Sequence, residues 1–220
     1  SVGSRFGVTI DKLKEAIDNE PDVIDGLSGI HFHTLCEQNS DDLLTTLNVV
    51  EEKFGFIMKD MQWINFGGGH HITRDDYDID TLIHCIQHVQ DTYNVKVYLE
   101  PGEAVALNAG YLISTVLDKV DNGITTLILD TSAACHMPDV LEMPYTPPLQ
   151  GAKALKRFAL TADTESSSAH CCRLSSYTCL AGDIIGDYEF DHEINIGDRL
   201  VFEDMAIYSM VKNNTFNGIP

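Results

Sequence analysis

The sequence predicts an α/β fold in the first part of the chain and an all-β fold in the second. Strand-like and helix-like segments alternate as far as residue 102, and short strand-like segments separated by turns follow. Strand–helix–strand units imply parallel pairing with right-handed crossovers, and a run of short strands implies a separate β domain. The 220 residues suffice for one large domain, or one with a small second. We place the α/β part at 1–110 and the mainly β part at 111–220.

Hydrophobic spacing and end signals predict the elements of the α/β part. A first helix covers residues 40–55, with Ser40 as its N-cap and Gly55 marking its end. A second helix, residues 78–93, carries apolar side chains along one face. The expected strands around these helices lie at 26–35, 61–69 and 95–102.

The second part is predicted as short strands and turns. A proline-rich segment, 136–151, argues against regular structure, because proline lacks the N–H that helices and sheets need. The segment 177–190 is predicted to be rich in turns. The expected strands lie at 109–120, 123–132, 157–162, 170–177, 194–204 and 206–212.

About three strand–helix units precede the β part, too few to close a (β/α)₈ barrel, which takes roughly 250 residues. We therefore expect the chain to be an incomplete piece of a larger protein, or to need a partner that supplies the rest.

The chain is strongly acidic, with 34 Asp and Glu against 14 Lys and Arg and a formal net charge of −20. Binding to phosphate-rich surfaces needs clustered Lys and Arg, so this balance argues against nucleic-acid and anionic-membrane partners. No apolar run approaches the roughly 20 residues that span a bilayer. The first residues also lack the layout of a secretory signal.

Cysteine usage indicates a reducing compartment. The six cysteines form no CxxC pair, and the adjacent Cys171 and Cys172 are poorly placed for a disulfide with each other. Free thiols are typical of the cytoplasm, which is the location we expect.

Two motifs end consecutive predicted strands. The triple glycine Gly67–Gly69 follows one strand directly, and glycines allow close approach of the backbone to an anion such as phosphate. Glu100 closes the next strand, and carboxyl ends of strands are where α/β active sites lie. A tight turn and a helix-capping carboxylate are the ordinary alternatives.

Histidines at strand ends support a different hypothesis. His31 and His33 alternate on one strand and therefore share a face, and His70 and His71 follow the next strand. A metal-dependent hydrolase uses such pairs to hold Zn²⁺. Hydrogen-bonded core histidines are the commoner outcome.

The β part offers three further reactive side chains. Cys179 and Asp183 lie in the turn-rich segment, where a thiol and a carboxylate can perform acid–base chemistry. Tyr208, expected in a strand, can offer its hydroxyl to a phosphate or pack in the core.

Taken in order, these motifs resemble the carboxynorspermidine (carboxyspermidine) decarboxylases, within the fold-type III pyridoxal-phosphate group that includes ornithine and diaminopimelate decarboxylases. The resemblance runs from about residue 26 to the end. LEPG and GGG are shared across the group, whereas CHMPDVLEMPY and CLAGDIIGD are far more specific. The segments that carry it are FHTLCE, INFGGGHH, LEPGEA, TSAACHMPDVLEMPY, TCLAGDIIGDY and GDRLVFEDMAIYSMVKNNTFNG.

The resemblance implies an alanine-racemase-like (β/α)₈ barrel, of which this chain holds the C-terminal part, followed by a β-sandwich or β-barrel domain. It also implies a homodimer with shared active sites, pyridoxal 5′-phosphate as cofactor, no metal ion, and a place in polyamine biosynthesis. In the α/β part, His33 matches the histidine that stacks on the cofactor ring, and Glu100 the carboxylate that pairs with the pyridine nitrogen. The residues that match positions around the phosphate are Cys36, Gly67, Gly68, Gly69, Gly102 and Tyr208.

In the β part, Cys179 matches the residue that protonates the substrate carbon, on a loop that reaches into the partner's active site. The residues expected to face the polyamine are Asp130, His136, Asp139, Glu142 and Asp183. Carboxylates there suit a cationic amine. Glu103 stands where relatives commonly carry Arg.

The Schiff-base lysine of the family lies on an early barrel strand, and no lysine of this chain has a matching context. We therefore predict a pyridoxal-phosphate-dependent carboxy-lyase that forms norspermidine or spermidine, and expect the isolated chain to be inactive. Two alternatives remain at this stage: a non-catalytic homologue that binds a related protomer, and the metal-dependent hydrolase. The lysines lie at positions 12, 14, 53, 59, 96, 119, 153, 156 and 212.

Overall fold

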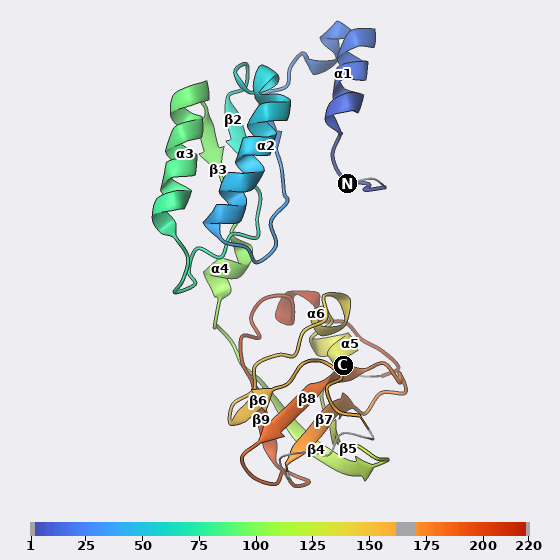
Figure 1. Ribbon diagram of the computed structural model, residues 1–220. Helices are drawn as coiled ribbons and strands as arrows, with labels where there is room; N and C mark the ends of the chain where they lie inside the picture. The colour runs from blue at the N-terminus through green and yellow to red at the C-terminus, as the bar shows by residue number, and fades with distance from the viewer. Residues whose placement is uncertain (1–2, 162–169, 219–220) are drawn as a thin grey trace. The chain divides into compact units, whose positions relative to one another are not determined.

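The computed structural model describes residues 3–161 and 170–218 (Figure 1). The chain divides into two compact units, Ser1–Val105 and Ala106–Pro220. Each unit has its own hydrophobic core.

The first unit contains a three-stranded parallel sheet in the order β1-β2-β3. In its register, Ile30 lies beside Ile64, and Ile64 beside Val97. Two long helices, α2 and α3, lie side by side against the sheet (Figure 1). This arrangement confirms the predicted strand–helix alternation. The bounds are β1 (Gly29–His31), α2 (Ser40–Met58), β2 (Trp63–Asn65), α3 (Ile79–Tyr93) and β3 (Lys96–Tyr98).

Apolar side chains from both helices build the core of this unit against the sheet. Spacing of three or four residues puts them on one helix face, as the sequence pattern requires. They surround Ile64 and Phe66, both fully buried. The contributing helix residues are Leu43, Leu47, Met58, Leu82, Cys85 and Val89.

The predicted ends of α3 are right; α2 begins at residue 40 as predicted, but its N-cap and its end differ from the prediction. Asp78 caps α3 by accepting a hydrogen bond from the Thr81 N–H, 3.1 Å away. In α2 the N-cap is Asn39 rather than Ser40, because the Ser40 hydroxyl donates to the Asp78 carbonyl instead. Gly55 lies inside the helix, which continues for a further turn.

Three shorter elements complete the first unit: α1 (Ile10–Asn19), η1 (Pro21–Ile24) and α4 (Gly102–Ala106). None of the residues of α1 is buried. Within residues 3–161 and 170–218, no helix has both the length and the apolar character needed to cross a membrane.

The second unit is built on a six-stranded sheet in the order β6-β8-β7-β5-β4-β9. Strands β5 and β7 pair in parallel, and the remaining pairs are antiparallel. The strands are β4 (Leu112–Asp121), β5 (Thr125–Leu129), β6 (Ala152–Ala154), β7 (Cys171–Ser176), β8 (Ile184–Phe190) and β9 (Arg199–Phe202).

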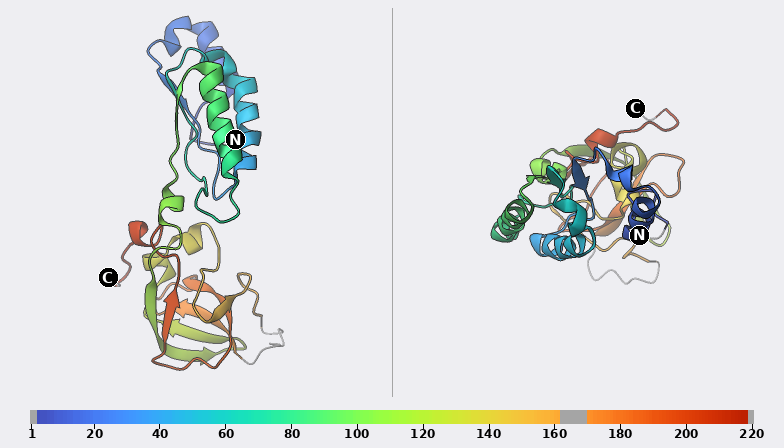
Figure 2. Two further views of the ribbon diagram at one scale, coloured as in Figure 1. Left: turned by 90° about the vertical axis from the view of Figure 1, so that its left-hand side faces the viewer. Right: turned by 90° about the horizontal axis from the view of Figure 1, so that it is seen from above.

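The six-stranded sheet is curled. The segment before β6 bonds to β9, with the Gln150 N–H donating to the Val201 carbonyl and the Glu203 N–H to the Pro148 carbonyl. The two edges of the sheet therefore approach each other around a core that includes Tyr188. Two short helices, α5 (Ala133–His136) and α6 (Asp139–Glu142), lie at one end of this sheet (Figures 1 and 2).

Several predicted boundaries in this unit are wrong. The proline-rich segment contains α6, which Pro138 precedes, a position where proline leaves helix hydrogen bonds intact. Residues 157–161 form no strand, and the last residue of that prediction, Ala162, lies outside the described part. The turn-rich segment contains β8.

The predicted strand at 206–212 is a helical turn that includes η2 (Met210–Lys212). The Val211 N–H donates to the Ile207 carbonyl, and the Ser209 hydroxyl to that of Met205, which are helix-type contacts. Tyr208 therefore lies on a turn and is 51% exposed.

Candidate active site

The first unit places Glu100 two residues beyond the end of β3, next to residues that follow β1 and β2. The Asn65 amide, at the end of β2, donates to the Glu100 carboxylate with 2.8 Å between Nδ2 and Oε1. The other end of the same amide accepts the Gly67 N–H, 2.8 Å from Oδ1. Asn65 thus links the glycine turn to the Glu100 carboxylate.

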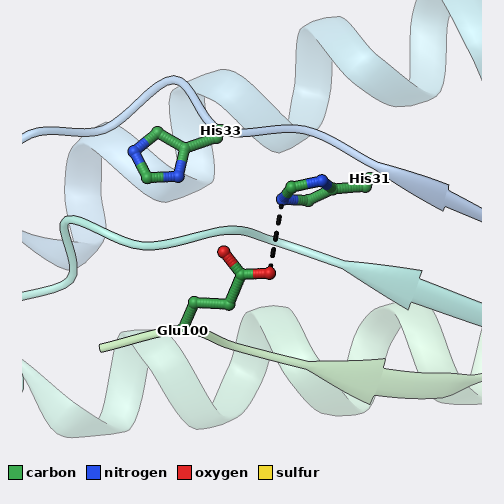
Figure 3. Close-up of side chains that lie close together, drawn as sticks. All are labelled: His31, His33 and Glu100. Atoms are coloured by element: carbon green, nitrogen blue, oxygen red, sulfur yellow. Dashed lines mark ion pairs between the residues drawn. The ribbon is translucent and has the colours of Figure 1, made fainter. Parts of the chain in front are cut away.

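Two histidines lie beside Glu100. His31 points at its carboxylate, with 3.6 Å between Nε2 and Oε1, and His33 lies next to the pair (Figure 3). All three side chains are exposed, and an exposed contact such as that between His31 and Glu100 contributes little to stability. The Gly68 N–H donates to Nδ1 of His33, so the proton of a neutral His33 ring lies on Nε2.

Close packing between the loops explains the triple glycine. A Cβ at Gly67 would lie 2.5 Å from the Phe32 carbonyl oxygen, and one at Gly68 would lie 2.7 Å from that of Glu100. Gly67 and Gly69 also have positive φ angles, which favour glycine. The turn therefore brings the loops after β1, β2 and β3 together. Two of its N–H groups bond to Asn65 and His33.

The two other expected phosphate contacts of this unit are exposed. Cys36 lies on the loop after β1. A Cβ at Gly102 would meet open space, and the Gly102 N–H donates to the Glu100 carbonyl, 2.8 Å away.

The four histidines of the hydrolase hypothesis do not share one site. His31 and His33 group with Glu100, whereas His71 groups with Glu37 and Glu103. His70 is buried, and its Nε2 lies 3.3 Å from the Phe66 carbonyl oxygen. Burial lowers the pKa of His70. Among the described residues no group of possible ligands contains all four, so the geometry does not support a single site built from them.

The second unit places Cys179 on an exposed loop, Tyr177–Gly182, which we call the Cys179 loop. The Asn217 amide donates to its sulfur, with 3.2 Å between Nδ2 and Sγ. Within the loop, the Leu180 carbonyl accepts the Asp183 N–H, 2.9 Å away. The thiol is therefore open to solvent on a loop held by backbone hydrogen bonds.

Asp183 is 1% exposed, and its carboxylate is occupied by neighbouring donors. The Ser132 and Thr178 hydroxyls donate to Oδ2 over 2.6 and 2.7 Å, and the Ala134 N–H donates to Oδ1 over 3.1 Å. Ser132 is also the N-cap of α5, the helix that carries His136. Its own N–H donates to Nδ1 of His136 over 2.9 Å.

The other expected polyamine contacts lie on nearby segments of this unit. Asp130 is exposed and accepts from the Ser114 hydroxyl and the Thr115 N–H. Burial raises the pKa of Asp130, but these hydrogen bonds together outweigh that effect and lower it. Asp139 and Glu142 are on α6, where Glu142 forms an ion pair with Lys212.

Tyr208 also lies beside Lys212, whose Nζ is 5.7 Å from the ring centroid. The phenol is exposed, and therefore accessible to a bound anion.

Residues 11–206 match the family described as "Pyridoxal-dependent decarboxylase, C-terminal sheet domain". The chain belongs to this family. The match covers most of both units, so the resemblance drawn from the motifs is confirmed.

Two curated relatives are similar over nearly all of this chain. The carboxynorspermidine/carboxyspermidine decarboxylase of Campylobacter jejuni is 44% identical over 219 residues, which cover 98% of this chain and 55% of that protein. The carboxyaminopropylagmatine decarboxylase of Synechocystis is 42% identical over 219 residues, which cover 99% and 52%. The chain thus spans about half the length of these relatives.

A solved structure shares the fold. Carboxynorspermidine decarboxylase of Campylobacter jejuni, complexed with norspermidine, matches with a TM-score of 0.83 at 42% identity. The match covers 100% of this chain and 58% of that one. These comparisons support neither the non-catalytic partner nor the metal-dependent hydrolase.

The side chains around Glu100 fit pyridoxal phosphate. An exposed carboxylate suits a protonated pyridine nitrogen, and an exposed imidazole next to it suits the face of an aromatic ring. Sequence reasoning did not find Asn65, which holds the carboxylate, although it directly precedes the phenylalanine and the triple glycine. The sequence signal for Asn65 is a side-chain amide at the end of a predicted strand, two residues before a glycine turn whose N–H groups need an acceptor.

Proposed function

We propose that the protein carrying this chain is a pyridoxal-phosphate-dependent decarboxylase of carboxynorspermidine or carboxyspermidine. The observation that carries the proposal is the exposed Glu100 carboxylate beside His33 at the strand ends of a chain in this family (Figure 3). The 44% identity to a carboxynorspermidine/carboxyspermidine decarboxylase over 98% of the chain supports the substrate.

Pyridoxal phosphate supplies an electron-withdrawing ring that accepts the electron pair left when a carboxylate departs as CO₂. Glu100 holds a proton on the pyridine nitrogen, because an anionic neighbour favours the charged ring. Asn65 keeps the Glu100 carboxylate in place. His33 packs against the ring, with Gly68 fixing the orientation of its imidazole.

Further residues of the first unit lie against the phosphate in this proposal: Cys36, Gly69 and Gly102. Gly102 leaves open space for it, whereas its N–H already donates to the Glu100 carbonyl. Tyr208 is proposed as a phosphate contact as well, because its side chain is exposed. Because Gly67 and Gly68 donate their N–H groups to side chains, they act by letting the loops pack closely.

Cys179 donates the proton that replaces CO₂ on the substrate carbon. Its exposed loop position supports this role. Four residues face the cationic chain of the substrate in this proposal: Asp130, His136, Asp139 and Glu142. The three carboxylates among them attract the positively charged amines.

The proposal includes the assembly. Residues 1–110 contribute the later strands and helices of an alanine-racemase-like (β/α)₈ barrel, and 111–220 form the β domain. The parallel pairing of β1, β2 and β3 supports the first part. The protein acts as a cytoplasmic homodimer, with the Cys179 loop reaching the partner's site. The acidic balance, −20, supports the absence of nucleic-acid and anionic-membrane partners.

The test measures CO₂ release by the protein as its gene encodes it. Carboxynorspermidine, carboxyspermidine and carboxyaminopropylagmatine are compared, since one relative acts on the last. We expect the first two to have the higher kcat/KM. A higher kcat/KM for carboxyaminopropylagmatine would mean that the proposed substrate is wrong. If no CO₂ were released from any of the three compounds, the proposed decarboxylase activity would be refuted.

Glu100→Gln is the site-directed arm of this test. We expect a loss of at least about 100-fold in kcat, since a neutral amide no longer holds the proton on the pyridine nitrogen. Glu52→Gln, on the exposed face of α2, is the matched control. Borohydride trapping and peptide mapping are expected to locate the cofactor-bearing lysine outside residues 1–220.

A further inference from the structure

Asp183 connects two segments that lie far apart in the sequence. Its buried carboxylate binds Thr178, next to the catalytic candidate Cys179, through Oδ2. The same oxygen binds Ser132, and Oδ1 binds the Ala134 N–H, both in the segment that carries His136. One carboxylate therefore contacts both the Cys179 loop and helix α5.

Each contact fixes a segment that holds a candidate site residue. Thr178 is the second residue of the Cys179 loop, and the backbone N–H of Asp183 closes this loop by donating to the Leu180 carbonyl. Ser132 caps α5 by accepting the Cys135 N–H, 3.1 Å from its Oγ. With its own N–H, Ser132 also orients His136.

The charge of Asp183 makes these contacts interdependent. Within the described residues no ion pair involves Asp183. Its carboxylate accepts instead from three neutral donors, the Ser132 and Thr178 hydroxyls and the Ala134 N–H. Loss of one donor leaves a buried carboxylate less well compensated. The carboxylate must then shift or admit water, and either change alters its bond to the other segment.

We propose that Asp183 is a positioning residue that holds the Cys179 loop and the His136 helix in one fixed arrangement. The proposal rests on the proposed function, in which Cys179 donates a proton and His136 faces the substrate. It replaces direct substrate contact as the role of Asp183, since that side chain is buried and already bonded.

Hydrogen–deuterium exchange of the protein as its gene encodes it tests the coupling without any activity measurement. Thr178→Val removes one hydroxyl and Ser132→Ala the other. We expect Thr178→Val to speed exchange in residues 133–136 at least about five-fold, the effect of roughly one hydrogen bond. Ser132→Ala is expected to speed exchange in residues 178–183 similarly.

Two matched variants control for general loosening. Thr178→Ser keeps the hydroxyl and is expected to restore the exchange rates. Ser114→Ala removes an equally buried serine that donates to Asp130 over 2.7 Å, in the same unit. It is expected to leave exchange in residues 133–136 and 178–183 unchanged.

Steady-state kinetics tests the positioning role. We expect Thr178→Val and Ser132→Ala each to lower kcat at least about ten-fold, because small misplacements of reacting groups are costly. Thr178→Ser is expected to recover it, with KM for Thr178→Val staying within about two-fold of the unaltered value.

The outcomes separate this proposal from the proposed function. Exchange changes confined to the mutated segment would refute the coupling. Coupled exchange with an unchanged kcat would refute the positioning role. If the unaltered protein decarboxylates none of the substrates, the proposed function fails, and the exchange experiment still decides whether Asp183 joins the two segments.

Discussion

Asn65 donates a hydrogen bond to Glu100 and accepts one from Gly67, and these two contacts fix the orientation of its amide. Nδ2 lies 2.8 Å from Oε1 of Glu100, and Oδ1 lies 2.8 Å from the Gly67 nitrogen. A flipped amide would place its NH₂ group against the Gly67 N–H and its oxygen against a carboxylate. Asn65 therefore presents a donor to Glu100, and only an amide satisfies both neighbours.

Replacing Asn65 tests how much this contact contributes to cofactor binding. Asn65→Asp keeps the acceptor for Gly67 but sets a second carboxylate against Glu100. We expect pyridoxal phosphate affinity to fall at least about ten-fold, since a hydrogen bond to a charged group contributes about 1.5–3 kcal/mol. Absorbance titration of the cofactor measures the dissociation constant.

Asn65→Ala removes both contacts and is expected to weaken binding as well. Asn48→Ala, an exposed position in the middle of α2, is the matched control and should bind normally. Unchanged affinity in Asn65→Asp would show that the donor has no part in holding the cofactor.

The sequence predicts the α/β part well wherever local signals agree with packing. Helix α3 has a capping aspartate, regular apolar spacing and the left-handed Asn94 at its end, and its predicted bounds hold. In α2 the local stop signal at Gly55 fails. Ile57 and Met58 are buried, so tertiary packing extends the helix past a residue that disfavours it.

The β part shows where pattern reasoning fails. An apolar run such as Ile207–Val211 resembles a strand, yet Met210 and Val211 are more than half exposed and the backbone is helical. For the candidate site, the family motifs predict Glu100 and His33, which the structure places close together. They do not reveal that Asp183 is buried, because burial depends on contacts 51 residues away in the chain.

The ion pair between Arg173 and Asp187 in the second unit is expected to contribute to stability. Arg173 binds Asp187 through Nε at 2.7 Å and Nη2 at 3.0 Å, and the Asp187 side chain is fully buried. These two hydrogen bonds compensate the buried charge of Asp187, and the Leu160 N–H donates a third to the same carboxylate. Arg173→Leu is expected to lower the free energy of unfolding by about 3–5 kcal/mol, measured by urea denaturation.

A double-variant cycle separates the pair from its surroundings. Arg173→Leu with Asp187→Leu should destabilise by less than the sum of the two single variants, because no charge is then left buried. Lys12→Ala breaks the exposed pair with Glu15 and should change stability little. Additive losses at Arg173 and Asp187 would contradict the expected coupling.

Two adjacent cysteines of β7 should differ in reactivity. Cys172 is buried, and burial, with a further contribution from Cys171, raises the pKa of its thiol to about 12. At pH 8 about one molecule in ten thousand then carries the thiolate, the form that reacts with iodoacetamide. We expect Cys171, which is half-buried, to be alkylated at least about ten-fold faster.

Peptide mass spectrometry after timed alkylation of the native protein measures both rates. Urea-unfolded protein is the control, in which the two thiols should react alike. Equal rates in the native protein would mean that Cys172 is not protected by the fold.

His70 should make stability depend on pH. Burial lowers its pKa from the ordinary 6.5, so the unfolded chain takes up a proton at a higher pH than the folded chain does. Stability from this group is therefore fully present above pH 6.5 and declines as the pH falls below that value. We expect His70→Gln to flatten the fall in the free energy of unfolding between about pH 7.5 and about pH 5.5.

Urea denaturation across this range measures the slope, and His84→Gln provides the comparison. His84 lies on the exposed face of α3, so its replacement should leave the slope close to that of the unaltered protein. Glutamine at position 70 can still donate to the Phe66 carbonyl, which His70 approaches through Nε2. The comparison therefore separates the effect of protonating the His70 ring from the effect of losing that hydrogen bond. If the free energy of unfolding depended equally on pH in His70→Gln and His84→Gln, His70 would not be the group responsible.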